Sequence, residues 1–278
     1  MSSGDRAAPQ AAGSTAAPES HARRLAVVGS EPTAEHSGAP AEVEHGPTAV
    51  RGPLLAVCGL CGGAGASTVA YLIALAAARA DPKPVLVADT GGPSGGLSWY
   101  ARVAAPRSLV EAAEQIAAGL PTGQLAATGD DGLRVLATEP RFTRACAREG
   151  VELLLEHARE RHALTVVDCG TLAREADQVA LAKATHVAWV LPATDSAARR
   201  AGRMLAAVPC LSSSELIIAR HDERKQKAAM RELRQLAEQR QATLVLLPSL
   251  PDLATGHLDH AIELAQVSLQ AIERVLSR

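Results

Sequence analysis

The sequence predicts an α/β protein whose doubly wound, mostly parallel sheet has about seven strands and carries helices on both faces. From residue 53 onward, short aliphatic runs alternate with longer segments of helical spacing. Nearly all of the short runs are apolar at successive positions, as strands are when both faces of a sheet are covered. The first run leads directly into a glycine-rich turn and a helix. In such sheets ligands bind beyond the carboxyl ends of the strands, so functional residues are sought there.

The expected strands are short runs rich in Val, Leu, Ile and Ala, most of which end next to Gly, Asp, Pro or Arg. In chain order they are Leu54–Cys58, Val85–Asp89, Leu133–Ala137, Leu164–Asp168, His186–Leu191, Glu215–Ala219 and Thr243–Leu247. The segments between them are long enough for crossover helices, so the strands are expected to run parallel.

The expected helices are the intervening segments in which apolar residues recur every three or four positions. They are Ser67–Ala80, Ser108–Ala118, Arg144–Arg161, Arg174–Ala182, Asp195–Val208, Glu223–Gln241 and Gly256–Leu276. Thr194 or Asp195 is expected to cap the helix that follows it. The last helix has few cations on its polar face, which favours packing against the sheet over binding to a membrane.

The composition excludes several classes of function. The 278 residues are 47% hydrophobic and carry a formal net charge of −2, so no general attraction to nucleic acid is expected. Aromatic residues make up 2% of the chain and offer no stacking platform for bases. The five cysteines lack regular spacing, and no apolar run is long enough to cross a bilayer. These features predict a cytoplasmic protein without a specific nucleic-acid partner.

Residues 1–52 differ in texture from the rest of the chain. They are rich in Ala, Pro, Gly, Ser and acidic residues and show no sustained helical or strand period. We therefore expect a disordered N-terminal arm, residues 1–52, followed by a single α/β domain, residues 53–278.

The clearest motif is the loop after the first expected strand, Gly59-Leu60-Cys61-Gly62-Gly63-Ala64-Gly65-Ala66-Ser67-Thr68. Glycines between a strand and a helix let backbone N–H groups turn toward a phosphate, and the helix N-terminus adds a partial positive charge. A standard P-loop places Lys directly before the Ser/Thr, and here that position is Ala66. Two interpretations stay open: a phosphate-binding loop without its ammonium group, or a turn that only joins strand to helix.

From Leu54 to the C-terminus, the chain resembles the MinD/ParA family of dimeric P-loop ATPases, because of Cys61–Thr68 and the Ala-rich helix after it. More narrowly, Gly62–Ser67 resembles the divergent branch that contains septum-site-determining-like and CpaE/TadZ-type pilus-localisation proteins. In that family one Lys near the loop start reaches across the dimer and a second precedes the Ser/Thr. Cys61 and Ala66 occupy these positions here, so the resemblance implies a degenerate Walker A site.

The resemblance assigns nucleotide binding to Gly62, Gly63, Ala64, Gly65, Ala66, Ser67 and Thr68. It assigns Mg²⁺ to Ser67 with Asp89 and Asp168, each of which ends an apolar run. The aspartate that positions the attacking water in active relatives aligns with Gly91, which offers no acceptor. We therefore assign no catalytic residue.

Together these features lead to one hypothesis and two alternatives. The hypothesis is a homodimeric MinD/ParA-like protein that binds ATP or ADP with Mg²⁺ and hydrolyses ATP weakly or not at all. It would act as a spatial-positioning or assembly scaffold, with protein partners in a division, pilus or secretion machine and membrane association only through those partners. The alternatives are a slow or partner-activated ATPase and a structural dimer that binds no nucleotide.

Three other features carry weaker interpretations. Cys58 and Cys61 have the spacing of a redox or metal pair, but no second Cys/His pair follows. Basic residues around Arg199, Arg200 and Arg220 could form a face for DNA, although interspersed acidic residues favour an ordinary solvated surface. Where the family often has Asn-Arg for adenine, the sequence has Ala219-Arg220, so no base pocket is predicted.

Overall fold

The computed structural model describes residues 51–90, 96–103, 107–121, 125–137, 147–209, 214–221, 227–250 and 257–278. All of them belong to one structural unit, Thr48–Arg278. Of the expected arm, only Arg51 and Gly52 fall within the described residues, so its disorder stays a prediction.

In the described part of the chain, eight strands form one sheet in the order β3-β4-β2-β5-β1-β6-β7-β8. Their bounds are β1 Leu54–Gly59, β2 Val85–Asp89, β3 Ala127–Thr128, β4 Arg134–Leu136, β5 Leu164–Asp168, β6 His186–Pro192, β7 Ser214–His221 and β8 Thr243–Pro248. Every pairing is parallel except that between β3 and β4 at one edge. The predicted fold class is confirmed, with the short antiparallel strand β3 as an addition.

Apart from α2, which the sequence pattern did not predict, the helices lie within the segments expected between and after the strands. Their bounds are α1 Ala66–Ala80, α2 Gly96–Ala101, α3 Leu109–Ala117, α4 Arg148–Arg161, α5 Glu175–Lys183, α6 Asp195–Ala206, α7 Lys227–Arg240 and α8 Leu258–Leu276, with a 3-10 turn at Asp130–Gly132. Ser108 begins α3 with a capping box to Glu111. The Thr194 hydroxyl caps α6 by accepting from the N–H of Ala197 at 3.3 Å.

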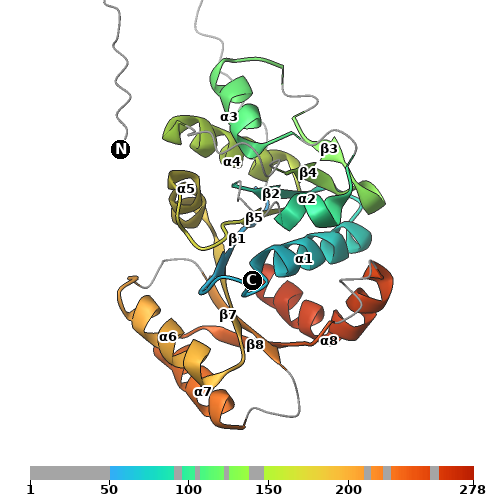
Figure 1. The fold of residues 1–278 in the computed structure, drawn as a ribbon. Coiled ribbons are helices and arrows are strands. Elements are labelled where there is room, and N and C mark those ends of the chain that lie inside the picture. Colours follow the sequence, from blue (N-terminus) through green and yellow to red (C-terminus); the bar gives the residue numbers. More distant parts are fainter. Residues whose placement is uncertain are drawn as a thin grey trace, which may run out of the picture. The chain divides into compact units, whose positions relative to one another are not determined.

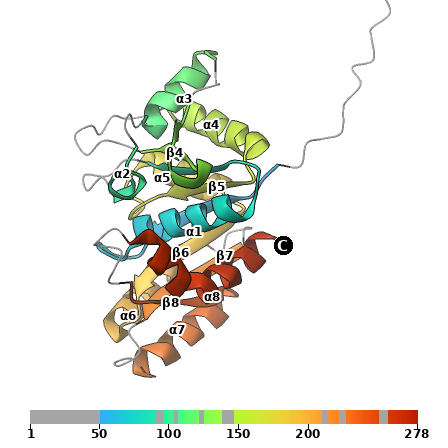
Figure 2. The same ribbon diagram turned by 90° about the vertical axis from the view of Figure 1, so that its right-hand side faces the viewer.

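The helices cover the sheet on both faces. In Figure 1, α1 and α8 lie to the right of the strands, while α5, α6 and α7 lie to the left. Figure 2 views the molecule from the side of α1 and α8. The buried residues form two aliphatic clusters, one on each face: α1 and α8 contribute to one, and α3 to α7 to the other. Ala261, Ala265 and Ile272 bury the apolar face of α8, so its predicted packing on the sheet is confirmed.

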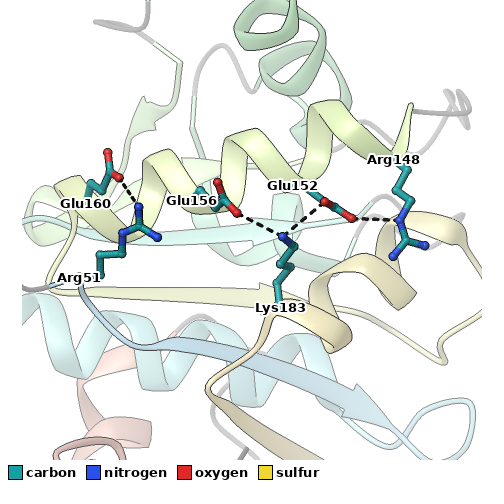
Figure 3. Close-up of polar contacts among 6 residues, drawn as sticks. All are labelled: Arg51, Arg148, Glu152, Glu156, Glu160 and Lys183. Atoms are coloured by element: carbon teal, nitrogen blue, oxygen red, sulfur yellow. Dashed lines mark hydrogen bonds and ion pairs between the residues drawn. The ribbon is translucent and has the colours of Figure 1, made fainter.

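Ion pairs join the start of the domain to the helices of one face. The ladder in Figure 3 consists of Arg51, Arg148, Glu152, Glu156, Glu160 and Lys183. Lys183, at the end of α5, bridges two carboxylates of α4 at 3.3 and 3.1 Å. Because these side chains are partly exposed, water screens the pairs, and each contributes little to stability. They link Arg51, α4 and α5 along one face of the sheet.

A buried polar cluster ties β6, β7 and α7 together. Glu215 of β7 accepts from the Nε1–H of Trp189 at 3.0 Å and from the Nε–H and Nη2–H of Arg240 at 2.9 and 2.6 Å. Arg240 also donates to the carbonyl oxygens of Leu205 and Val208. The Glu215 and Arg240 side chains are 4% and 7% exposed, so the pair is held away from solvent.

Candidate nucleotide-binding site

The glycine-rich loop leaves the middle of the sheet, since β1 lies between β5 and β6. Gly63 and Gly65 have φ angles of 70° and 92°, a region that residues with a Cβ rarely adopt. These two left-handed residues curl the chain before α1 begins at Ala66. Gly65 is the N-cap of α1, and no side chain caps that end.

The loop holds a set of backbone donors without acceptors. Among the described residues, no hydrogen bond is made by the N–H groups of Gly62, Gly63, Gly65, Ala66, Ser67 and Thr68. Ala64 differs from the other expected ligands because its N–H donates to the carbonyl of Cys61 at 3.2 Å and its side chain is buried. Unpaired N–H groups at an uncapped helix N-terminus are the arrangement that binds phosphate.

The acidic residues predicted for Mg²⁺ lie beside the loop. Asp89 and Asp168 are register partners on β2 and β5, and each is 5% exposed. The Asp168 carboxylate accepts hydrogen bonds from the Ser67 hydroxyl and from the N–H of Gly170. Burial raises the pKa of Asp168 above its ordinary value, and these two hydrogen bonds oppose the rise. The structure therefore brings together all three residues assigned to the metal.

The start of α2 closes over Ser67. A Cβ added to Gly96 would lie 2.4 Å from the Ser67 Oγ, so only glycine fits here without displacement. On the other side of the acidic pair, the Thr90 hydroxyl hydrogen-bonds the buried carboxylate of Asp177. The N–H of Arg174 donates to the same carboxylate at 2.9 Å. Neither Gly96 nor Asp177 stands out in the sequence, because each acts through a contact between distant segments.

Arg220 approaches the loop from the carboxyl end of β7. Its Nη2–H donates to the carbonyl oxygen of Gly63 at 2.7 Å. The Cδ, Nε and Cζ atoms of the same side chain pass 3.2–3.3 Å from the position that a Cβ on Gly65 would take. Arg220 is exposed, as expected for a solvated surface, but it lies at the end of a strand rather than on a helix. Its guanidinium lies on the glycine loop.

The remaining candidate features do not form a second site. Cys58 is buried in β1, whereas Cys61 is partly exposed in the loop. Within the described ranges, no three His, Cys, Asp or Glu side chains are grouped so that they could hold a metal ion. A divalent cation near Asp89 and Asp168 would thus need phosphate and water among its ligands, which is the coordination that Mg²⁺ prefers. The hydroxyl and carboxylate oxygens present are suitable ligands for Mg²⁺ bound together with a nucleotide.

The basic residues considered as a face for DNA include those of α6. On α6, Arg199 lies 3.9 Å from Asp195, an exposed pair one helical turn apart. Arg224 and Lys225 lie outside the described residues. A cavity of about 470 Å³ lies between α1 and α8 near the amino ends of β2 and β5, with Ile73 and Leu269 among its mostly aliphatic lining. No helix that the structure describes is long and apolar enough to cross a membrane.

Solved structures with the same architecture include ATPases of the ParA and MinD kind. The ParA family ATPase from Chlorobium tepidum TLS matches with a TM-score of 0.63 at 18% identity, covering 78% of this chain and 92% of its own. MinD in the MinC:MinD cell division complex of Aquifex aeolicus matches with a TM-score of 0.62 at 17% identity, covering 81% and 95%.

Another structure with this architecture was solved with ligands in place. Cobyrinic acid a,c-diamide synthase from Mycobacterium smegmatis, with a bound ATP analog and magnesium, matches with a TM-score of 0.57 at 17% identity, covering 80% of this chain and 96% of its own. No protein-family model and no curated protein sequence matches the chain. The structural matches nevertheless agree on one architecture, and the chain has the P-loop fold of the ParA and MinD ATPases.

Proposed function

We propose that the protein binds ATP or ADP with Mg²⁺ at the glycine loop and works as a positioning or assembly scaffold with weak or no ATP hydrolysis. The observation that carries the proposal is the row of N–H groups from Gly62 to Thr68, interrupted at Ala64, that have no partner among the described residues at the uncapped start of α1. A phosphate placed there would satisfy donors that otherwise stay unpaired.

The metal side of the site supports the same proposal. Ser67, Asp89 and Asp168 offer one hydroxyl and two carboxylates next to the loop, and Asp168 already hydrogen-bonds Ser67. Magnesium bound with a nucleotide takes one or two protein oxygens and fills its other positions with phosphate and water. When bound, the ion would neutralise phosphate charge, while Ser67 and Asp168 would hold its position.

Weak hydrolysis follows from what the loop lacks. Ala66 stands where a standard P-loop has its lysine, and Gly91 stands where active relatives orient the attacking water. Removal of a single preorganised donor to a developing charge typically costs a factor of about 100–1,000 in rate. Nucleotide binding requires fewer precisely placed groups than phosphoryl transfer does. Backbone N–H groups can hold a ground-state phosphate without stabilising the transition state.

The scaffold role and the homodimer are the broader part of the proposal. They are supported by the P-loop fold that the chain shares with ParA and MinD, and the Aquifex aeolicus structure holds MinD with MinC. Protein partners in division, pilus or secretion machinery are proposed on the same basis. Sedimentation of the full chain with and without Mg-ATP tests the dimer, since nucleotide-dependent dimerisation would shift the sedimentation coefficient.

Isothermal titration calorimetry on the full chain tests the central claim. We expect saturable binding of Mg-ATP and Mg-ADP in the micromolar range, weakened in Ser67→Ala when Mg²⁺ is present but not when it is chelated. Absence of saturable binding of either nucleotide would favour the purely structural dimer. Steady-state phosphate release above background that disappears in Ser67→Ala would instead identify a slow ATPase.

A further inference from the structure

We infer that Arg220 is the phosphate-binding cation of this site and replaces, from the end of β7, the lysine that the glycine loop lacks. The inference rests on the proposed function and goes beyond it by naming a side chain outside the loop. Arg220 and Gly63 are separated by 157 positions in the sequence, and the guanidinium joins them directly.

The sheet explains how this side chain reaches the loop. β6 separates β1 from β7, and Arg220 is the register partner of Pro192, where β6 ends. The main chain at Arg220 is fixed by a hydrogen bond from the N–H of Ala193 to its carbonyl oxygen at 2.9 Å. An arginine side chain is long enough to extend from this anchored point over the end of β6 to Gly63. The backbone is therefore rigid where the side chain begins, which limits the positions its guanidinium can take.

The groups around the Arg220 guanidinium favour the binding of an anion. Arg220 makes one hydrogen bond, to Gly63, and has no carboxylate partner among the described residues. Its positive charge lies on the same loop as the unpaired N–H groups at the start of α1. These N–H groups are the positive end of the helix dipole, so they and the guanidinium repel one another. A polyphosphate would turn this repulsion into attraction, because each positive group would face negative oxygens.

The geometry also leaves donors for the ligand. An arginine has five N–H donors, of which the bond to Gly63 uses one. The planar guanidinium can donate two parallel hydrogen bonds to two phosphate oxygens at once. A lysine ammonium has no such fixed pair of donors. The side chain passes 3.2 Å from the position that a Cβ on Gly65 would take, so it lies directly on the loop.

The test is nucleotide affinity of the full chain with Arg220 changed. Calorimetry with Mg-ATP and Mg-ADP compares wild type with Arg220→Ala, Arg220→Gln and Arg220→Lys. Arg200→Ala is the matched control, because Arg200 is exposed on α6 and the substitution removes the same charge. Far-UV circular dichroism and thermal unfolding establish that each variant folds; Arg220 is exposed, and its one bond contributes little to stability.

We expect Arg220→Ala and Arg220→Gln to weaken binding of both nucleotides by about 10- to 100-fold, and Arg220→Lys by less. The glutamine variant is informative because it keeps a polar side chain at the end of β7 and removes the positive charge. Arg200→Ala should bind as wild type does. If Arg220→Ala binds nucleotide as tightly as wild type or more tightly, the inference is overturned. Arg220 would then block the loop rather than bind phosphate.

Failure of the proposed function gives a different result. If wild type binds neither nucleotide, both the proposed function and the role of Arg220 are refuted. If wild type binds and Arg200→Ala loses as much affinity as Arg220→Ala, binding at the loop stands, but the specific role of Arg220 is refuted. Binding that falls only in the Arg220 variants supports the inference.

Discussion

Replacing Gly96 by alanine should destabilise the protein through a single contact. A Cβ at this position would lie 2.4 Å from the Oγ and 2.8 Å from the Cβ of Ser67. The first distance is roughly 1 Å short of van der Waals contact, so either α2 or the Ser67 side chain must move. If Ser67 rotates, its hydrogen bond to the Asp168 carboxylate is lost.

The magnitude follows from competing terms. Overpacking of this kind costs about 1–3 kcal/mol, and a hydrogen bond to a charged group contributes about 1.5–3 kcal/mol. Against this, Gly→Ala restricts the unfolded chain and stabilises by about 0.4–1 kcal/mol where the backbone allows it. Gly96 has no positive φ, so this gain applies. We expect Gly96→Ala to lower the free energy of unfolding by about 1–3 kcal/mol.

Urea denaturation in two backgrounds tests this reasoning. In Ser67→Gly, both atoms that the new Cβ would meet are absent, so adding Gly96→Ala should be neutral or stabilise by up to about 1 kcal/mol. Gly96→Ala should therefore lower the free energy of unfolding in the wild-type background but not in the Ser67→Gly background. An equal loss in both backgrounds would refute the contact as the cause, and so would a gain in the wild-type background.

Three further predictions concern buried charge and can be checked by chemical denaturation. Arg240→Met should lower the free energy of unfolding by about 3–5 kcal/mol, because it strands the buried Glu215 carboxylate; the double variant Arg240→Met/Glu215→Leu should lose less than the single. Asp168→Asn should be more stable than wild type at about pH 7. Burial raises the pKa of Asp168, so this advantage should shrink as pH falls toward 3.8 and be absent below it; a constant difference would contradict the reasoning. Burial lowers the pKa of His186, so wild type should lose stability as pH falls below 6.5, and His186→Gln should lose less; parallel pH curves would exclude this cause.

The sheet could be predicted closely because its strands are uniform. Val85–Asp89 and Leu164–Asp168 have the bounds expected from the sequence, since each is a continuous aliphatic run that stops at a buried aspartate. The two-residue strand β3 and the six-residue helix α2 were missed because segments this short do not show a recognisable hydrophobic periodicity. The parts of Arg144–Arg161 and Glu223–Gln241 before α4 and α7 lie outside the described residues.

The candidate site could be predicted only where its residues follow one another in sequence. The glycine loop and the two strand-terminal aspartates have local signatures, and Asp168 indeed lies within hydrogen-bonding distance of Ser67. Arg220 has no such signature, because an exposed arginine after an aliphatic strand is typical of any sheet edge. Its contact with Gly63 depends on β7 lying two strands from β1, which is a property of the topology.

A cation delivered from β7 favours binding over catalysis. A loop lysine is attached to the backbone that cradles the phosphate, so it is held where charge develops during transfer. Arg220 instead reaches the loop through a long, exposed side chain whose observed contact is with a loop carbonyl. Ordering that side chain has an entropic cost, which a bound polyphosphate offsets through ground-state contacts. Contacts made equally before and during transfer raise affinity without raising the rate, which is the behaviour expected of a scaffold that uses nucleotide as a structural ligand.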